Sequence, residues 1–128
     1  MTRPKVPVVL LVDDHADTLT MYAEMLRFSG FDVLQAADGA EALALGADTR
    51  PSIVVTDLRM PGRVSAEEIC RHFAATGIPV IAVTASVKTR EHDAIRAAGC
   101  GVVLLKPLTP DRLISEIRRA LPHGGPVV

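Results

Sequence analysis

The sequence predicts an α/β protein built on a doubly wound, five-stranded parallel sheet with helices on both faces. Five short runs of aliphatic and β-branched residues are each followed by a segment with helical spacing of its apolar residues. The connections between them are short. The strand runs have no polar face, so each strand needs a helix layer on both sides, and right-handed crossovers supply these layers. The pattern therefore favours an open sheet of repeated βα units.

The first half of the chain predicts three strands and two helices. Residues 7–12 form a continuous apolar run, which is typical of a strand buried on both faces. Residues 15–29 have helical spacing, and the more polar strand 31–36 is expected nearer an edge of the sheet. A second helix, opened by Asp38-Gly39, runs to about residue 48, and the strand 53–57 follows. The apolar faces of the two helices are Leu19, Tyr22, Ala23 and Leu26, then Ala40, Leu43, Ala44 and Ala47.

The second half predicts three helices and two strands in alternation. Residues 65–76, 87–98 and 110–121 are the expected helices, and 79–83 and 102–105 are the expected strands, the first of them ending in Thr84. Glycines at the ends of the helical patterns favour helix termination, and Pro110 suits a first helical position. The helix 65–76 begins with the capping-box pair Ser65 and Glu68, and the helix 110–121 has the apolar face Leu113, Ile114, Ile117 and Leu121.

Length and composition place the chain among globular proteins with one domain. Of 128 residues, 48% are hydrophobic and 23% charged, and the formal net charge is -1. We expect one domain over 1–121, with 122–128 as a flexible tail or the start of a linker. The charge is not basic enough to favour direct nucleic-acid binding, and no apolar run reaches the roughly 20 residues of a membrane span.

Two features indicate a cytoplasmic location. The N-terminal apolar run leads into Asp13-Asp14-His15, where a signal peptide would need a small-residue cleavage site. Cys70 and Cys100 are the two cysteines, and they form no CxxC pair. We expect both thiols to be free, reduced and buried.

Four of the five predicted strands end in a side chain that could carry chemistry. Asp13-Asp14 ends the first, Asp57 the third, Thr84 the fourth and Lys106 the fifth. The carboxyl ends of parallel strands share one edge of the sheet. In a strand order of 2-1-3-4-5 the first and third strands are neighbours at the switch point where ligands bind, which would bring Asp57 beside the acidic pair.

Three carboxylates at one point repel each other unless a cation or protons intervene. Oxygen ligands alone favour Mg²⁺ over zinc or copper. With a hydroxyl donor at Thr84 and an ammonium at Lys106, the set suits receipt of a phosphoryl group on an aspartate, because the charge of the transferring group is neutralised on several sides. Taken singly, each group has a simpler interpretation: Asp14 or Asp17 as a helix N-cap, Thr84 as a helix start, Lys106-Pro107 as a solvated turn and His15 as a surface residue.

The sequence resembles the receiver domain of two-component response regulators over about residues 7–121. The resemblance lies in four motifs, which are Leu11-Val12-Asp13-Asp14-His15, Thr56-Asp57-Leu58-Arg59-Met60-Pro61, Val83-Thr84-Ala85 and Leu105-Lys106-Pro107. The resemblance implies a flavodoxin-like fold. The strand order 2-1-3-4-5 used above is in part an implication of this resemblance, because a chemotaxis receiver, a relative in fold, has the same order.

The resemblance also implies a role for each site residue. Asp57 would be the phosphoacceptor, and Asp13, Asp14, Asp57 and the backbone carbonyl of Arg59 would form the Mg²⁺ site. Thr84 would hydrogen-bond the phosphoryl group, and Lys106 would pair first with Asp57 and then with the phosphate. A cis Lys106-Pro107 peptide is expected as well, and Arg59 and Ser86 stand where the family tunes the phosphoryl lifetime.

Two positions depart from the family pattern. Val103 stands where relatives usually carry Tyr or Phe, and Ser65 stands where a glycine is common.

The leading hypothesis is a phosphorylation-dependent switch that takes its phosphoryl group from a histidine kinase or histidine phosphotransfer protein. It would act on an effector domain or a downstream protein and would not itself be a classical enzyme.

The sequence also leaves room for a function of a different class. A non-phosphorylated pseudo-receiver that serves as an interaction module is the alternative, and Val103 is its main support. No GxGxxG or GxxxxGK pattern supports a nucleotide-binding enzyme. The sequence also leaves open a homodimer formed through the face of 87–98 and 110–121, where Arg112, Glu116, Arg118 and Arg119 either serve that contact or are merely solvated.

Overall fold

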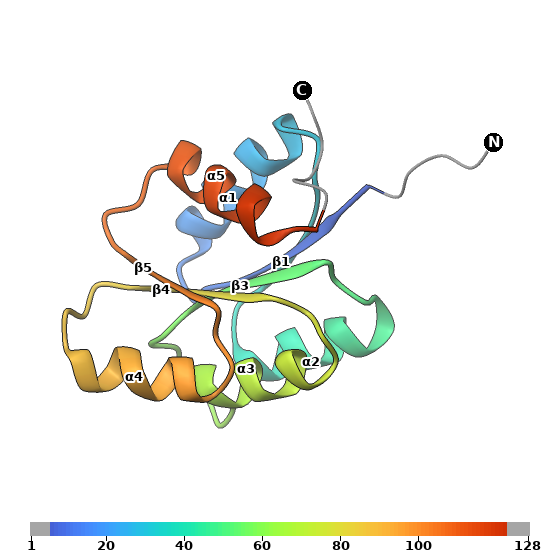
Figure 1. Ribbon diagram of the computed structural model, residues 1–128. Helices are drawn as coiled ribbons and strands as arrows, with labels where there is room; N and C mark the ends of the chain where they lie inside the picture. Colours follow the sequence, from blue (N-terminus) through green and yellow to red (C-terminus); the bar gives the residue numbers. More distant parts are fainter. Residues whose placement is uncertain (1–5, 123–128) are drawn as a thin grey trace.

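The computed structural model describes residues 6–122, and it contains a five-stranded sheet with five helices in strict alternation (Figure 1). All neighbouring strands are parallel and the strand order is β2-β1-β3-β4-β5. The predicted fold class and strand order are therefore confirmed. The elements are β1 (Val8–Val12), α1 (Ala16–Phe28), β2 (Asp32–Ala36), α2 (Gly39–Asp48), β3 (Ile53–Asp57), α3 (Ala66–Ala75), β4 (Val80–Thr84), α4 (Thr89–Ala97), β5 (Val102–Leu105) and α5 (Pro110–Ala120).

Local signals set the ends of these elements. Asp38 and Ser65 cap α2 and α3, and their side chains accept hydrogen bonds from the backbone N–H groups of Glu41 and Glu68. Gly30, just past α1, has a φ of 97°, a conformation that residues with a Cβ rarely adopt. Each observed element lies within two residues of the predicted one, because caps and glycines act on their immediate neighbours. Residues 123–128 of the predicted tail lie outside the described residues.

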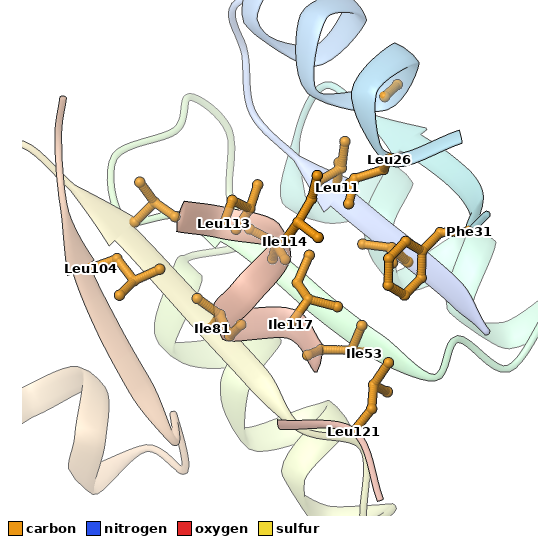
Figure 2. Close-up of a cluster of buried hydrophobic side chains, with 14 of the residues drawn as sticks. Leu11, Leu26, Phe31, Ile53, Ile81, Leu104, Leu113, Ile114, Ile117 and Leu121 are labelled. Atoms are coloured by element: carbon orange, nitrogen blue, oxygen red, sulfur yellow. The ribbon is translucent and has the colours of Figure 1, made fainter. Parts of the chain in front are cut away.

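Two apolar clusters hold the helices onto the sheet. Helices α1 and α5 cover one face, and α2, α3 and α4 cover the other (Figure 1). The first cluster joins alternate strand residues to α1 and α5, and Ile81, Ile117 and Phe31 lie inside it (Figure 2). The second joins the intervening strand residues to the other three helices, with Phe73 of α3 only 1% exposed. Burial on both faces explains why the strands carry no polar face.

Four further observations bear on the sequence predictions. Strand β2 lies at an edge of the sheet, as its polarity predicted. Cys70 and Cys100 are free and buried. Glu116 is also buried, and ion pairs with Arg112 and Arg119 on its own helix compensate its charge, so this carboxylate is not a solvated group on the outer face of α5. No helix within residues 6–122 is long and apolar enough to cross a bilayer.

Candidate functional site

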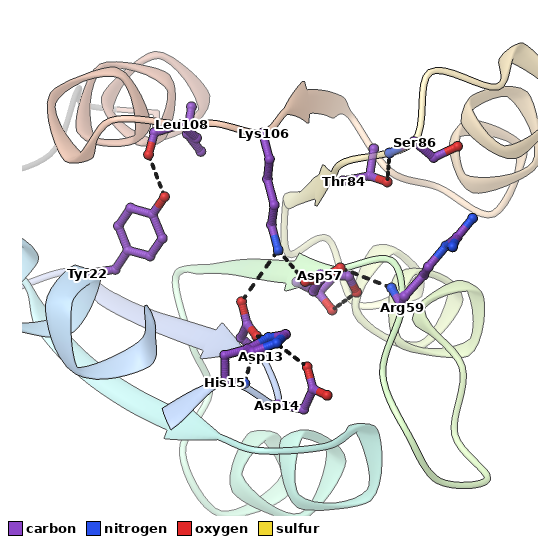
Figure 3. Close-up of polar contacts among 11 residues, drawn as sticks. Asp13, Asp14, His15, Tyr22, Asp57, Arg59, Thr84, Ser86, Lys106 and Leu108 are labelled. Atoms are coloured by element: carbon purple, nitrogen blue, oxygen red, sulfur yellow. Dashed lines mark hydrogen bonds and ion pairs between the residues drawn. The ribbon is translucent and has the colours of Figure 1, made fainter. Parts of the chain in front are cut away.

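The side chains at four strand ends converge on the carboxyl edge of the sheet (Figure 3). The first residues after β1, the last residue of β3, the last residue of β4 and the first residue after β5 all lie there. Because β1 and β3 are neighbours and β4 follows β3, the topology alone brings these strand ends together. The residues concerned are Asp13, Asp14, Asp57, Thr84 and Lys106.

Lys106 is the centre of the site. Its Nζ donates a hydrogen bond of 2.6 Å to Asp57 Oδ2 and lies 4.0 Å from Asp13 Oδ2. Two carboxylates from different strands therefore share one ammonium. The carboxylates of Asp13 and Asp57 belong to residues that are each only 8% exposed, so their charges would be costly without this partner.

The protonation state of Lys106 follows from its surroundings. Burial lowers the pKa of the Lys106 ammonium, but the hydrogen bond and charge of Asp57, together with the charge of Asp13, outweigh burial, and the pKa lies above its ordinary value. The lysine is therefore fully charged at neutral pH.

The orientation of the Asp57 carboxylate is held at both oxygens. Oδ2 accepts from Lys106, and Oδ1 accepts a 3.0 Å hydrogen bond from the backbone N–H of Arg59. Arg59 lies in the loop that leaves β3, and its own side chain reaches Glu91 of α4 at 3.3 Å. The pKa of the Glu91 carboxyl lies below its ordinary value. A hydrogen bond with Ser86 is the largest cause, and the charge of Arg59 lowers the pKa further. The ion pair between Arg59 and Glu91 thus joins the loop after Asp57 to the first turn of α4.

Thr84 supplies a hydroxyl group at the end of β4. The residue is 1% exposed, and its Oγ1 accepts a 3.0 Å hydrogen bond from the backbone N–H of Ser86. The alternative that Thr84 starts a helix is wrong, because it ends β4 and α4 begins only at Thr89. The surface hollow above it is lined by His15, Asp57, Arg59, Thr84 and Lys106, among others.

An acidic group, formed by Asp13 and Asp14 together with His15, lies at the end of β1. The carboxylates of Asp13 and Asp14 and the imidazole of His15 bring their possible ligand atoms within 4.8 Å of one another. His15 Nδ1 lies 3.2 Å from Asp13 Oδ1 and 3.2 Å from Asp14 Oδ1. The donor set offers carboxylate oxygens on an open, partly solvated edge, which suits a hard cation that keeps several of its waters.

Other single-residue alternatives also fail in the structure. His15 itself occupies the N-cap position of α1, without a side-chain cap, so Asp14 and Asp17 are not N-caps. Lys106 is half-buried and ion-paired and is not a solvated turn residue. The Lys106-Pro107 peptide is cis, as the family resemblance implied.

The structure adds contacts of two residues near the site that the sequence does not predict. The side chain of His15 is 70% exposed, as a surface residue would be, yet it contacts both carboxylates. Its position directly after an acidic pair at a strand end was the available signal. Tyr22 packs against the core beneath α1, as predicted, and its hydroxyl also donates to the carbonyl of Leu108 in the loop after Lys106.

Comparison with known proteins agrees with the fold. The family model for the response regulator receiver domain matches residues 9–118. The chain therefore belongs to the receiver domain family of two-component response regulators, whose members are regulatory phosphoacceptor domains.

Particular relatives include full-length regulators and single receivers. Response regulator MprA of a Mycobacterium species is 36% identical over 124 residues, covering 92% of this chain and 54% of the relative. DNA-binding response regulator MtrA of Mycobacterium tuberculosis is 32% identical, covering 88% of this chain and 50% of the relative. The chain thus spans about half the length of these relatives. The chemotaxis protein CheY4 of Vibrio cholerae superposes with a TM-score of 0.84 at 27% identity, covering 91% of this chain and all of the other.

Proposed function

We propose that this chain is a phosphorylation-dependent switch that accepts a phosphoryl group on Asp57 with the help of Mg²⁺. The observation that carries the proposal is the 2.6 Å contact between Lys106 Nζ and the buried carboxylate of Asp57, with Asp13 on the same ammonium. A carboxylate held in one orientation beside a fixed positive charge is suited to attack phosphorus, and the charge remains to bind the product.

The residues have separate tasks in this transfer. One oxygen of Asp57 forms a new bond to phosphorus while the bond between phosphorus and the donor's imidazole nitrogen breaks, and the imidazole keeps the electron pair. Lys106 then pairs with the phosphoryl oxygens. Thr84 exchanges its hydrogen bond from Ser86 for one to the phosphoryl group, which requires the loop after β4 to adjust.

The cation would be held by Asp13, Asp14, Asp57 and the backbone carbonyl of Arg59. Oxygen donors at an open edge support this assignment, and Asp13 links the acidic group to Lys106. When bound, Mg²⁺ supplies positive charge next to the phosphoryl oxygens.

The proposed partners follow from the same chemistry. A histidine kinase or histidine phosphotransfer protein would supply the phosphoryl group. The output would be an attached effector domain or a separate downstream protein, as the two-domain length of the relatives suggests. Homodimerisation through α4 and α5 and the absence of direct nucleic-acid binding by this domain stay predictions.

Labelling by a small phosphodonor tests the proposal. Acetyl phosphate should label the wild-type protein only when Mg²⁺ is present, and Asp57→Asn should abolish labelling. The matched control is Asp48→Asn, which removes an exposed carboxylate at the end of α2 and should label normally. Label that persists in Asp57→Asn would contradict the assignment.

The alternative is a pseudo-receiver that binds partners without phosphorylation. Val103 favours it, because a valine packed in the cluster under α2, α3 and α4 offers no ring to rotate. The complete set of Asp13, Asp57, Thr84 and Lys106 argues against it. A protein that binds no Mg²⁺ at millimolar concentration would support this alternative.

A further inference from the structure

Tyr22 of α1 contacts the loop that carries Lys106. Its hydroxyl donates a 2.5 Å hydrogen bond to the backbone carbonyl of Leu108, which is 86 positions away in the sequence (Figure 3). Leu108 is only two residues past the lysine, in the connection between β5 and α5. A side chain on one helix therefore fixes the segment from which the Lys106 side chain projects.

The ring of Tyr22 also borders the site directly. Together with Asp13, Asp57 and Lys106 it lines a cavity of about 20 Å³, which is room for about one water molecule. Figure 3 shows the tyrosine on the side of Lys106 opposite Thr84. Tyr22 packs against the apolar cluster under α1 and α5, whereas Val103 packs in the cluster on the other face of the sheet.

Hydrogen bonds hold both ends of the connection between β5 and α5. At one end the backbone N–H of Lys106 donates a 2.8 Å hydrogen bond to the carbonyl of Thr84. At the other end Thr109 caps α5 by accepting from the backbone N–H of Arg112 at 3.2 Å. Between them, the bond from Tyr22 ties the middle of the connection to α1. Its loss would leave the carbonyl of Leu108 without this donor and the backbone next to Lys106 freer to move.

We propose that Tyr22 is a positioning residue for Lys106, acting through the carbonyl of Leu108. The proposal rests on the proposed function of the site, because it assigns Tyr22 to the same phosphoryl transfer. The hydroxyl restrains the backbone beside Lys106, and this restraint keeps the ammonium within hydrogen-bond distance of Asp57. Tyr22 itself touches neither the carboxylate nor the incoming phosphoryl group.

Removing the hydroxyl alone provides the kinetic test. Tyr22→Phe should slow Mg²⁺-dependent phosphorylation by acetyl phosphate about threefold to tenfold, the range of one hydrogen bond. In a Lys106→Ala background the same substitution should slow the reaction no further, because the group on which it acts is gone. Thr20→Ala removes a hydroxyl from an exposed position of α1 and is the matched control. An unchanged rate in Tyr22→Phe, or equal slowing in both backgrounds, overturns the proposal.

A second measurement does not depend on phosphorylation. Competitive acylation of lysines, followed by mass spectrometry, should find Lys106 protected relative to the exposed Lys88 of the same molecule. Tyr22→Phe should reduce this protection severalfold at unchanged global stability. Unchanged protection overturns the proposal. If the wild-type protein accepts no label from acetyl phosphate but the protection of Lys106 still responds to Tyr22→Phe, the proposed function fails and the positioning role stands.

Discussion

Lys106 and Asp57 form a 2.6 Å ion pair at the carboxyl edge of the sheet, although 49 positions separate them in the sequence. The aspartate ends β3 and the lysine follows β5, with β4 between them. The long lysine side chain spans the intervening strand and also approaches Asp13. The stability of the domain and the chemistry of the site therefore depend on the same charge.

Lys106→Ala should destabilise the protein at neutral pH. The substitution leaves the carboxylates of Asp57 and Asp13 without their shared cation, and we expect a loss of about 1–3 kcal/mol in the free energy of unfolding, because the lysine is partly exposed and the pair is partly screened. Urea unfolding measures the change. The control Lys88→Ala, at an exposed lysine, should cost little, and an equal cost in the Asp57→Asn background would contradict the pairing.

Mg²⁺ should stabilise the folded protein through the acidic group. A ligand that binds only the folded state at ten times its Kd adds about 1.4 kcal/mol to the free energy of unfolding. Asp13→Asn and Asp14→Asn should each remove most of this gain, as followed by the Tm at increasing Mg²⁺. Asp17→Asn changes an exposed carboxylate of α1 near the site and should retain the gain. A gain in stability that survives in both Asp13→Asn and Asp14→Asn would place the cation elsewhere.

The single tyrosine permits a direct alkaline titration. Burial raises the pKa of Tyr22 above its ordinary value of 10.0, and the charge of Asp13 adds to this while that of Lys106 opposes it. The protonated phenol is thus favoured by folding. Its contribution to stability is complete below the pKa of the unfolded chain, about 10, and is lost as pH rises through the higher native pKa.

Phenolate absorbance should therefore have its midpoint above pH 10.0 in the native protein. Lys106→Ala should move the midpoint further up, since it removes the charge that lowers the pKa. Asp13→Asn should move it down. A native midpoint at or below the ordinary value would show that the phenol is solvated.

Gly46→Ala should destabilise the protein, although alanine is the better helix former by about 1 kcal/mol. A Cβ at position 46 of α2 would lie 2.6 Å from two ring carbons of Phe73, which is buried beneath it. The ring must shift within a packed core, and we expect a net loss of about 1–2 kcal/mol in thermal or urea unfolding. Phe73→Leu should cost less in the Gly46→Ala background than alone, and strict additivity would argue against the contact.

Cys70 and Cys100 should be unreactive in the native protein. The residues are 0% and 5% exposed. A hydrogen bond between the two thiols, together with burial, raises the pKa of the Cys70 thiol, whereas the same hydrogen bond lowers the pKa of the Cys100 thiol to about 7. Burial alone therefore protects Cys100 from a reagent in solution. An aromatic disulfide reagent should modify neither thiol on the time scale on which it modifies both in urea. Fast modification of Cys70 in the native chain would mean that α3 opens readily from the sheet, and fast modification of Cys100 would mean that the connection between α4 and β5 does.

The order and ends of the secondary structure elements are visible in the sequence. Apolar runs, helical spacing, caps such as Ser65 and stops such as Gly30 act on residues within one or two turns. For the same reason the sequence placed Asp57, Thr84 and Lys106 correctly at strand ends. The resemblance to receiver domains added the strand order and the cis peptide before Pro107, neither of which a local pattern specifies.

The tertiary structure decided which of these groups touch. That Lys106 pairs closely with Asp57 and more distantly with Asp13, that His15 contacts both members of the acidic pair, and that Tyr22 bonds the carbonyl of Leu108 all depend on sheet pairing and helix packing. Periodicity carries no information about contacts between residues 49 or 86 positions apart. Such contacts exist only once the crossovers have placed β1, β3 and β5 in one sheet and laid α1 beside the loop that leaves it.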